Sequence, residues 1–212
     1  MGSFVIGLVM TVLFLVPASA DDLQYFLGAG VGGTSLDGDV TNRSRVYYND
    51  EDTGFKIFAG HMFKDWIGLE LGYANFGEAE LQGDNGSTFQ SDGRTYTFSA
   101  DDSRIKAEVS SWFTGLILVL PMDKATGSDS LKWLNPFVKA GGQYYDVEFD
   151  VHKGSMSAAP ASYDGFNFYL GGGINFDFFK YWAFRTEFEY FPMDDGVVED
   201  VYLYSGSLIL RF

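Results

Sequence analysis

The stretch VYLYSGSLILRF, residues 201–212, ends the chain and decides the fold. Its large apolar residues alternate with small or polar ones up to the last position, which is typical of a β-strand with two different faces. The ends of soluble chains usually have too few contacts to stay ordered. We therefore interpret this stretch as the closing strand of a β-barrel, although a soluble edge strand that ends in phenylalanine is an alternative.

The beginning of the sequence predicts export. An apolar run at residues 4–16 is followed by Ala18 and Ala20, small residues in the A-x-A pattern that a signal peptidase reads. The run is shorter than the roughly 20 residues that a membrane-spanning helix needs. No lysine or arginine precedes it, which leaves the true start codon open. We expect residues 1–20 to be a signal peptide and residues 21–212 to form the mature domain.

Composition narrows the class of protein. The sequence has no cysteine, 26 glycines and 18% aromatic residues, and its mean hydropathy is −0.03. Without cysteine there is neither a disulfide framework nor a lipidated N-terminal cysteine, so an exported chain must be stabilised in another way. The middling hydropathy argues against a helical membrane protein and is compatible with short alternating strands.

Alternation with period two recurs along the mature chain and predicts eight strands. They are expected at residues 25–33, 53–63, 67–74, 105–121, 137–145, 166–179, 184–190 and 201–212. One face of these strands is apolar and aromatic, whereas the other is mainly glycine with a few charges of both signs. Glycine is a poor strand residue unless another group approaches closely. Residues 105–121 end in an apolar run on both faces, so their orientation stays open.

These two faces predict an all-β fold, an eight-stranded antiparallel transmembrane up-and-down β-barrel. Apolar side chains would face lipid, and small residues would leave room for packed polar groups inside. Closure also removes unpaired strand edges, which a bilayer does not tolerate. On the last strand, apolar residues occupy alternate, lipid-facing positions and the final residue is a phenylalanine. This pattern resembles the signal read by the outer-membrane assembly machinery. The residues of this expected signal are Phe212, Leu210, Leu208 and Tyr204.

Three stretches resemble the OmpA-like eight-stranded outer-membrane β-barrel family. They are TGFKIFAGHMFKDWIGLELGYANFG (residues 53–77), FVKAGGQYYDVEF (137–149) and YWAFRTEFEYF (181–191). The resemblance covers essentially the whole mature chain. It implies a monomeric barrel in the outer membrane of a Gram-negative bacterium. Because the sequence ends at the barrel, we expect no peptidoglycan-binding domain and no tether to the cell wall.

The resemblance also implies an ion network in the lumen of the barrel. Glu70 and Arg185 match positions where the family buries an ion pair, and Lys139 and Glu187 match polar positions beside it. Asn175 stands where an acid can occur in the family, which leaves the composition of the network open. Charges held away from bulk water must pair, so these residues are expected to plug the barrel.

Other motifs have weaker functional meaning. GAGVGG at residues 28–33 matches a dinucleotide-binding pattern but is not followed by a helical pattern, so no cofactor is expected. His152 has Ser155 and Asp150 nearby, which keeps a lipid-modifying enzyme as an alternative. His61 is expected near the lipid interface. The acidic stretches 37–39 and 49–52 could bind a divalent cation weakly, but we expect solvated loops and no metal site.

The distribution of charge along the sequence indicates which partners the protein can bind. The connections expected at residues 37–52, 83–104, 146–164 and 193–200 hold 17 acidic and 5 basic residues, a net charge of −12 out of −15. Long connections in such barrels face outward from the cell. An acidic outer rim disfavours nucleic acid. It favours basic partners, or Mg²⁺ and Ca²⁺ that bridge to lipopolysaccharide phosphates.

These observations predict a non-enzymatic surface protein with a structural role in envelope integrity or an adhesin-like role. Its expected partners are outer-membrane lipid and lipopolysaccharide, the assembly machinery, and a possible surface ligand bound through the acidic loops. A small ion-conducting pore is a further alternative, because the residues alone do not tell whether the barrel conducts.

Overall fold

The computed structural model describes residues 24–212, except 39–40, 92, 154–155, 158–160 and 194–197. The expected signal peptide, with Ala18 and Ala20, lies outside the described residues and stays a prediction. Among the described residues, no helix is long and apolar enough to cross a membrane.

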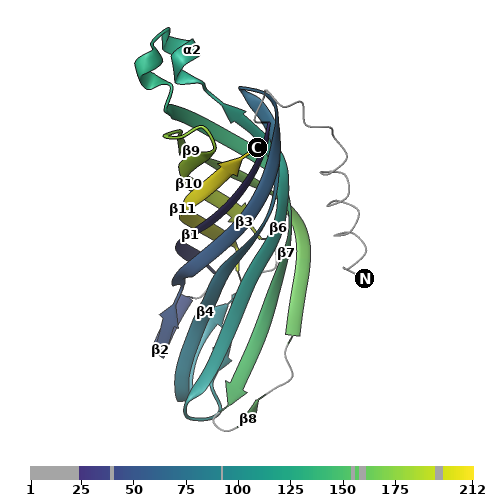
Figure 1. The fold of residues 1–212 in the computed structure, drawn as a ribbon. Helices are drawn as coiled ribbons and strands as arrows, with labels where there is room; N and C mark the ends of the chain where they lie inside the picture. The colour runs from purple at the N-terminus through teal and green to yellow at the C-terminus, as the bar shows by residue number, and fades with distance from the viewer. Residues whose placement is uncertain (1–23, 39–40, 92, 154–155, 158–160, 194–197) are drawn as a thin grey trace.

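Eight long strands of the described chain form a closed antiparallel barrel (Figure 1). They are β1 (Tyr25–Asp37), β3 (Glu51–Lys64), β4 (Ile67–Ser91), β6 (Ser103–Val119), β7 (Leu134–Lys153), β9 (Ala161–Phe176), β10 (Trp182–Pro192) and β11 (Asp200–Arg211). Each of them pairs with two neighbours, and the pairing of β4 with β6 completes the ring. The predicted fold class is confirmed.

The first and last strands close the barrel along their whole length. β1 pairs with β11 from Phe26 opposite Arg211 to Asp37 opposite Asp200. Beyond this ladder, the Tyr25 N–H donates to the carbonyl of Phe212 at 3.0 Å, and the Phe212 N–H donates to the carbonyl of Tyr25 at 2.9 Å. The chain therefore ends on a paired residue, which explains why the strand pattern continues to its last position.

The two ends of the barrel differ. One end carries the C-terminus, the turn between β3 and β4, and the short helices α2 (Met122–Thr126) and η1 (Asp129–Leu131). The other carries the short strands β2 (Thr41–Asn49), β5 (Arg94–Thr97) and β8 (Met156–Ser157). Short turns of outer-membrane barrels face the periplasm and long connections face the exterior, so β2, β5 and β8 lie on the extracellular side.

Several strands are much longer than the sequence predicts. Residues 83–104 and 146–164 were expected to be loops, but β4 continues to Ser91 and β7 to Lys153. A membrane-crossing strand needs only about 9–11 residues, whereas β4 has 25. The expectation was wrong because backbone pairing continues outside the membrane, where both faces can carry polar residues and hydrophobic alternation disappears.

We call this projecting part the extracellular overhang. It consists of residues 78–91 of β4, 103–108 of β6, 146–153 of β7 and 161–164 of β9, together with β2, β5 and residues 98–102 between β5 and β6. Its inner side has a small apolar cluster in which Leu81, Phe89 and Phe98 are buried against partly buried Val46, Tyr48 and Ile105. The overhang is therefore a packed sheet that continues the barrel wall.

A bulge in β4 marks where the overhang begins. The register between β4 and β6 shifts between Asn75 and Glu78, and Gly77 there has a φ of 82°. A Cβ atom on Gly77 would lie 2.3 Å from Oδ2 of Asp52. That oxygen accepts the Glu78 N–H at 2.8 Å. The carboxylate thus satisfies a backbone donor at the bulge, where the strand bends.

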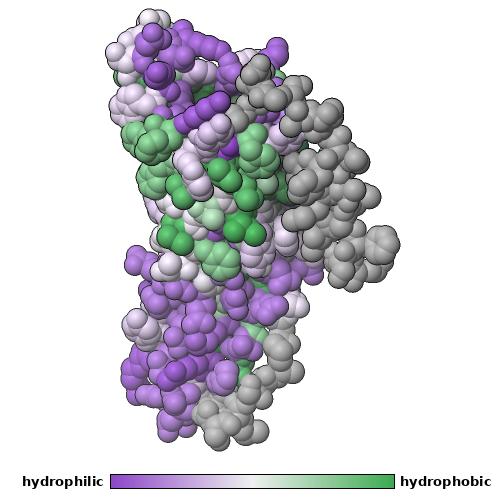
Figure 2. All heavy atoms as spheres, viewed as in Figure 1, coloured by the Kyte–Doolittle hydropathy of each residue, from purple (hydrophilic) through white to green (hydrophobic). Residues whose placement is uncertain are grey.

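A hydrophobic band surrounds the barrel between its two polar ends. Figure 2 shows green residues across the middle of the visible face and purple residues over the overhang. On β6, Trp112, Leu116 and Leu118 are exposed on the outer surface, whereas Phe113 and Ile117 are buried inside. This settles the orientation of the strand, which its sequence left open.

Candidate functional site

Six charged side chains meet inside the barrel, and we call them the ion cluster. Its members are Lys56, Glu70, Lys139, Arg185, Glu187 and Glu189, each at most 5% exposed. They come from β3, β4, β7 and β10, whose inward faces converge at this level. Three are cations and three are anions, so the ion cluster is neutral in its fully ionised form.

Lys139 is the centre of the ion cluster. Its Nζ atom lies 2.8 Å from Oε1 of Glu70, 2.7 Å from Oε2 of Glu187 and 2.7 Å from Oε1 of Glu189. An ammonium group has three donors and no acceptor. Lys139 therefore forms ion pairs with three carboxylates, which come from two strands on different sides of the barrel.

The other two cations complete the ion cluster. Arg185 Nη1 lies 2.6 Å from Oε2 of Glu70, and Arg185 Nε donates to Oδ1 of Asn175 at 2.8 Å. Lys56 Nζ lies 2.5 Å from Oε1 of Glu187 and also pairs with Glu189. The structure thus brings together all four residues expected in the lumen, with Asn175 as a neutral acceptor beside them.

Lys56 and Glu189 were missing from the expected network. Alternation already placed both on inward faces, so the signal was present in the sequence. The four residues implied by the resemblance balance one another in charge, and therefore gave no reason to look for more. Lys56 and Glu189 add one charge of each sign and preserve that balance.

Glycines on neighbouring strands provide the space for these side chains. A Cβ atom on Gly171 would lie 2.9 Å from Cε of Lys139 and 3.1 Å from Cγ of Glu189. Within the GAGVGG motif, a Cβ atom on Gly28 would lie 2.2 Å from the ring of Phe58. The inward glycine faces that the sequence shows are therefore explained by close packing in a narrow lumen.

Aromatic side chains cover the ion cluster on both sides. Toward the periplasm, the Arg185 guanidinium lies 4.6 Å from the ring centroid of Phe137 and 4.9 Å from that of Phe58. Toward the exterior, Lys139 Nζ lies 5.4 Å from the Phe113 centroid, and the rings of Phe113 and Tyr169 are 5.2 Å apart. Cations over ring faces are attracted to the π-electrons, so the rings hold the charges while filling the lumen.

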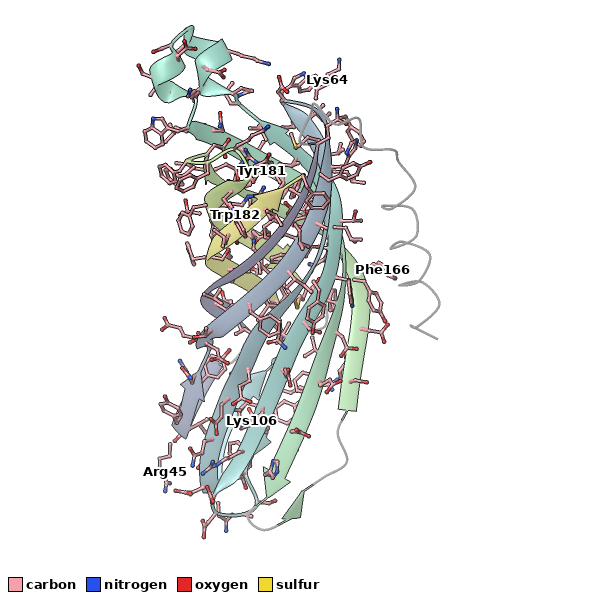
Figure 3. The ribbon with its side chains drawn as sticks, in the orientation of Figure 1. Arg45, Lys64, Lys106, Phe166, Tyr181 and Trp182 are labelled. Atoms are coloured by element: carbon pink, nitrogen blue, oxygen red, sulfur yellow. The ribbon has the colours of Figure 1, made fainter. Side chains whose placement is uncertain are left out.

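The outer face of the overhang is rich in carboxylates. Exposed acids there are Asp84, Asp101, Asp102, Glu108, Glu148, Asp150 and Asp164. Some acids of the overhang are paired: Lys106 Nζ lies 2.5 Å from Oε1 of Glu78, and Arg104 Nη2 lies 3.1 Å from Oδ1 of Asp102. Figure 3 shows Arg45 and Lys106 on this part of the molecule, far from Tyr181 and Trp182 at the periplasmic end.

Packing in the overhang shifts the pKa values of two acidic groups. Burial, and then the negative charges of Asp50 and Asp37, raise the pKa of Tyr48 to about 12. Burial and the nearby carboxylate of Asp164 raise the pKa of Asp146. Both shifts have the direction expected when negative charges lie close together on a partly dehydrated surface.

The remaining candidate residues do not form a site in the described part of the chain. His152 and Asp150 lie on β7, but Ser155 lies outside the described residues. Asp39 is outside them as well, and Asp52 uses its carboxylate on backbone N–H groups. His61 lies on β3 with its ring centroid 4.6 Å from that of Tyr25. Among the described residues, no group of three His, Cys, Asp or Glu could hold a metal ion.

The last strand presents its expected assembly residues to the outside. Tyr204, Leu208 and Phe212 are 61%, 54% and 57% exposed on the outer surface, and Leu210 is partly buried beside them. The Phe212 ring stacks on that of Tyr25 with centroids 6.2 Å apart. Recognition of these residues by the assembly machinery remains a prediction.

Deleting Phe212 should reduce the amount of folded barrel in the outer membrane much more than Glu148→Ala on the overhang. The deletion removes a lipid-facing aromatic and two backbone hydrogen bonds at the closing seam, whereas Glu148 is solvated. The heat-modifiable fraction on a gel measures folding in isolated outer membranes. Equal folded amounts for the deletion and the wild type would contradict the role of Phe212 in assembly.

Comparison with known proteins agrees with this geometry. The model of the outer membrane protein beta-barrel domain family matches residues 6–207. The chain therefore belongs to this family and is an integral protein of the Gram-negative outer membrane. The predicted family resemblance and location are confirmed. A search of curated protein sequences finds no match.

Two solved structures illustrate the shared fold. The crystal structure of Ail, the attachment invasion locus protein of Yersinia pestis, has a TM-score of 0.52 and 13% identity over 89% of this chain and 98% of Ail. That of the outer membrane protein OprG from Pseudomonas aeruginosa has a TM-score of 0.52 and 14% identity over 89% of this chain and 97% of OprG. At these identities the comparisons establish the fold alone.

Proposed function

We propose that this protein is a non-enzymatic surface protein that binds a cationic partner through the acidic outer face of its overhang. The observation that carries the proposal is the packed, projecting sheet with its exposed carboxylates. Because β-pairing and an apolar cluster hold the sheet, its charges are ordered before a partner arrives. Preorganised charges lose less conformational entropy on binding than charges on a loose loop.

The position of the carboxylates favours a partner outside the membrane. Glu148 and Asp150 occupy alternate positions of β7, and Glu108 lies opposite Glu148 on β6. All three are exposed, so they present negative charge on one surface of the sheet. Such a patch attracts a basic protein or peptide and accelerates its association at low ionic strength.

A second candidate is a role in envelope integrity through divalent cations. The overhang begins directly at the extracellular edge of the hydrophobic band, at the level where lipopolysaccharide phosphates are expected. Mg²⁺ or Ca²⁺ could bridge exposed carboxylates to those phosphates, since both ions prefer oxygen ligands. In this case binding would require lipopolysaccharide and would be lost on chelation.

The interior supports a function other than solute passage. The ion cluster and its aromatic neighbours fill the lumen between its two openings. An eight-stranded barrel is only wide enough for side chains to fill its interior. We therefore favour a surface role over a pore.

The binding proposal is tested with two matched double variants in nanodiscs. Glu148→Gln/Asp150→Asn removes two exposed charges from the overhang, and the control Asp123→Asn/Asp129→Asn removes two near the periplasmic end. The first should weaken the binding of an oligolysine peptide and reduce its salt dependence, and the control should not. Equal affinity of both variants and the wild type would overturn the proposal.

A different measurement tests the second candidate, the bridging of carboxylates to lipopolysaccharide by divalent cations. Nanodiscs that contain lipopolysaccharide are titrated with Mg²⁺, with and without the overhang substitutions, and the retention of lipopolysaccharide is followed. Loss of Mg²⁺-dependent retention in Glu148→Gln/Asp150→Asn alone would support cation bridging. Retention that is the same in every variant would contradict it.

A further inference from the structure

The periplasmic opening of the barrel contains a cavity separate from the acidic overhang. It has a volume of about 290 Å³. It lies on the periplasmic side of the ion cluster, among the ends of the strands and the segment that carries α2 and η1. A water molecule takes up about 30 Å³ in the liquid. The cavity is therefore large enough for a small organic anion or a phosphate group with some of its water.

Charged residues around this cavity are mainly cationic. The cations are Lys124, Lys132, Lys180, Arg185 and Arg211, and the anions are Asp65, Asp123 and Asp177. This excess contrasts with the net charge of −15 for the whole chain. A concave site with one prevailing sign of charge concentrates ions of the opposite sign.

Two of these cations already form ion pairs with aspartates. Arg211 Nη2 lies 2.6 Å from Oδ1 of Asp177, and Lys124 pairs with Asp65. The Asp177 carboxylate also accepts the Asn135 side-chain amide at 2.8 Å. These contacts fix the wall of the cavity, so their charges are held in defined positions.

Two exposed lysines at the cavity have no ionic partner, and the buried Arg185 has donors to spare. Lys132 and Lys180 make no ion pair with any residue that the structure describes. Arg185, 3% exposed, lies at the inner end of the cavity. Its Nε and Nη1 atoms bond to Asn175 and Glu70, but its Nη2 atom makes no hydrogen bond to a described residue. This N–H pair is therefore free to donate to an anion or to water in the cavity.

The walls between these donors are apolar. Phe26, Ile117 and Ile209 line the cavity and are buried at 6%, 1% and 1% exposure. Apolar walls exclude water and strengthen the attraction between an anion and the donors. Guanidinium and ammonium groups bind carboxylate and phosphate oxygens through charge-assisted hydrogen bonds.

We propose that the periplasmic cavity is a binding site for an oxyanion, a carboxylate or phosphate group that is held by Lys132, Lys180 and the free edge of Arg185. The oxyanion could belong to a free solute or to a carboxyl group at the end of a peptide chain. Either would enter from the periplasm, because the ion cluster closes the other side. This site is independent of the proposed extracellular function.

The test uses the full-length barrel in nanodiscs and follows backbone and arginine side-chain N–H signals by NMR. Inorganic phosphate represents a free anion, and an N-acetylated dipeptide with a free carboxylate represents the chain end. Sodium chloride at equal ionic strength serves as the reference. We expect saturable shifts at Asn135, Asn175 and the Arg185 side chain with at least one of the two probes. The probe that binds identifies the source.

Variants connect this binding to the cavity. Lys132→Gln/Lys180→Gln removes both amines that form no ion pair, without touching the ion cluster, and should weaken binding at least about tenfold, the loss expected for one charged hydrogen bond. Lys106→Gln on the overhang is the control and should bind like the wild type. Non-saturable shifts for both probes would overturn the proposal, as would equal affinity in the wild type and the double variant.

Discussion

Replacing Lys139 with methionine should lower the free energy of unfolding by about 3–5 kcal/mol, the usual effect of removing one partner from a buried ion pair. Methionine keeps most of the side-chain volume but removes the charge. Three buried carboxylates, those of Glu70, Glu187 and Glu189, would then face only Lys56 and Arg185. Reversible urea unfolding in lipid bilayers measures the change.

A double-mutant cycle separates charge from packing. Glu189→Gln restores neutrality in the background of Lys139→Met, so the double variant should be less destabilised than the sum of the two single variants. Lys106→Met is the surface control: its amine pairs with Glu78 in solvent, and its loss should cost at most about 1 kcal/mol. Strict additivity in the cycle would show that Lys139 and Glu189 are not coupled.

The substitution Leu116→Arg should destabilise the barrel by about 2–4 kcal/mol, the range for arginine on the lipid face near the bilayer midplane. Leu116 is 50% exposed on the outer surface of β6. It lies between Trp112, on the extracellular side, and Leu118 toward the periplasm. The charge would therefore enter the hydrocarbon region, and the same unfolding measurement detects the loss.

The control for this prediction lies on the overhang. Glu148 is exposed on the adjoining strand β7, and Glu148→Arg should change the stability by no more than about 0.5 kcal/mol, as is usual for a surface position. A larger loss of stability for Leu116→Arg than for Glu148→Arg would show that the edge of the membrane lies between the levels of these two residues. Equal effects would mean that Leu116 does not face lipid, or that the overhang does not lie in water.

The membrane-embedded part of the fold was predictable from the sequence because both of its environments are uniform. Lipid outside selects apolar residues, and the narrow lumen selects mainly glycine and a few charges, so period-two alternation appears on the spanning strands except at the end of β6, where Phe113 and Ile117 are apolar residues inside. Outside the membrane this contrast disappears. The polar residues 83–104 and 146–164 were therefore expected to be loops, although much of them forms paired strands.

The ion cluster was predictable in part. Alternation placed Lys56 and Glu189 inside the barrel, but one-dimensional patterns do not tell which inward charges lie at the same height. That depends on the stagger between strands, which brings Lys139 of β7 to Glu70 of β4 and to Glu189 of β10. The periplasmic cavity was not predictable, because the expected polar turns gave no sign of a space between them.

The most direct test of the account asks whether the barrel passes solutes. Wild-type protein is reconstituted into liposomes, and the rate of swelling in a small sugar such as arabinose is compared with that of protein-free liposomes and of an open porin. A lumen closed by the ion cluster and its aromatic neighbours predicts no swelling above the protein-free rate. Swelling at a rate close to that of the porin would contradict the closed lumen, and with it the surface role that we propose.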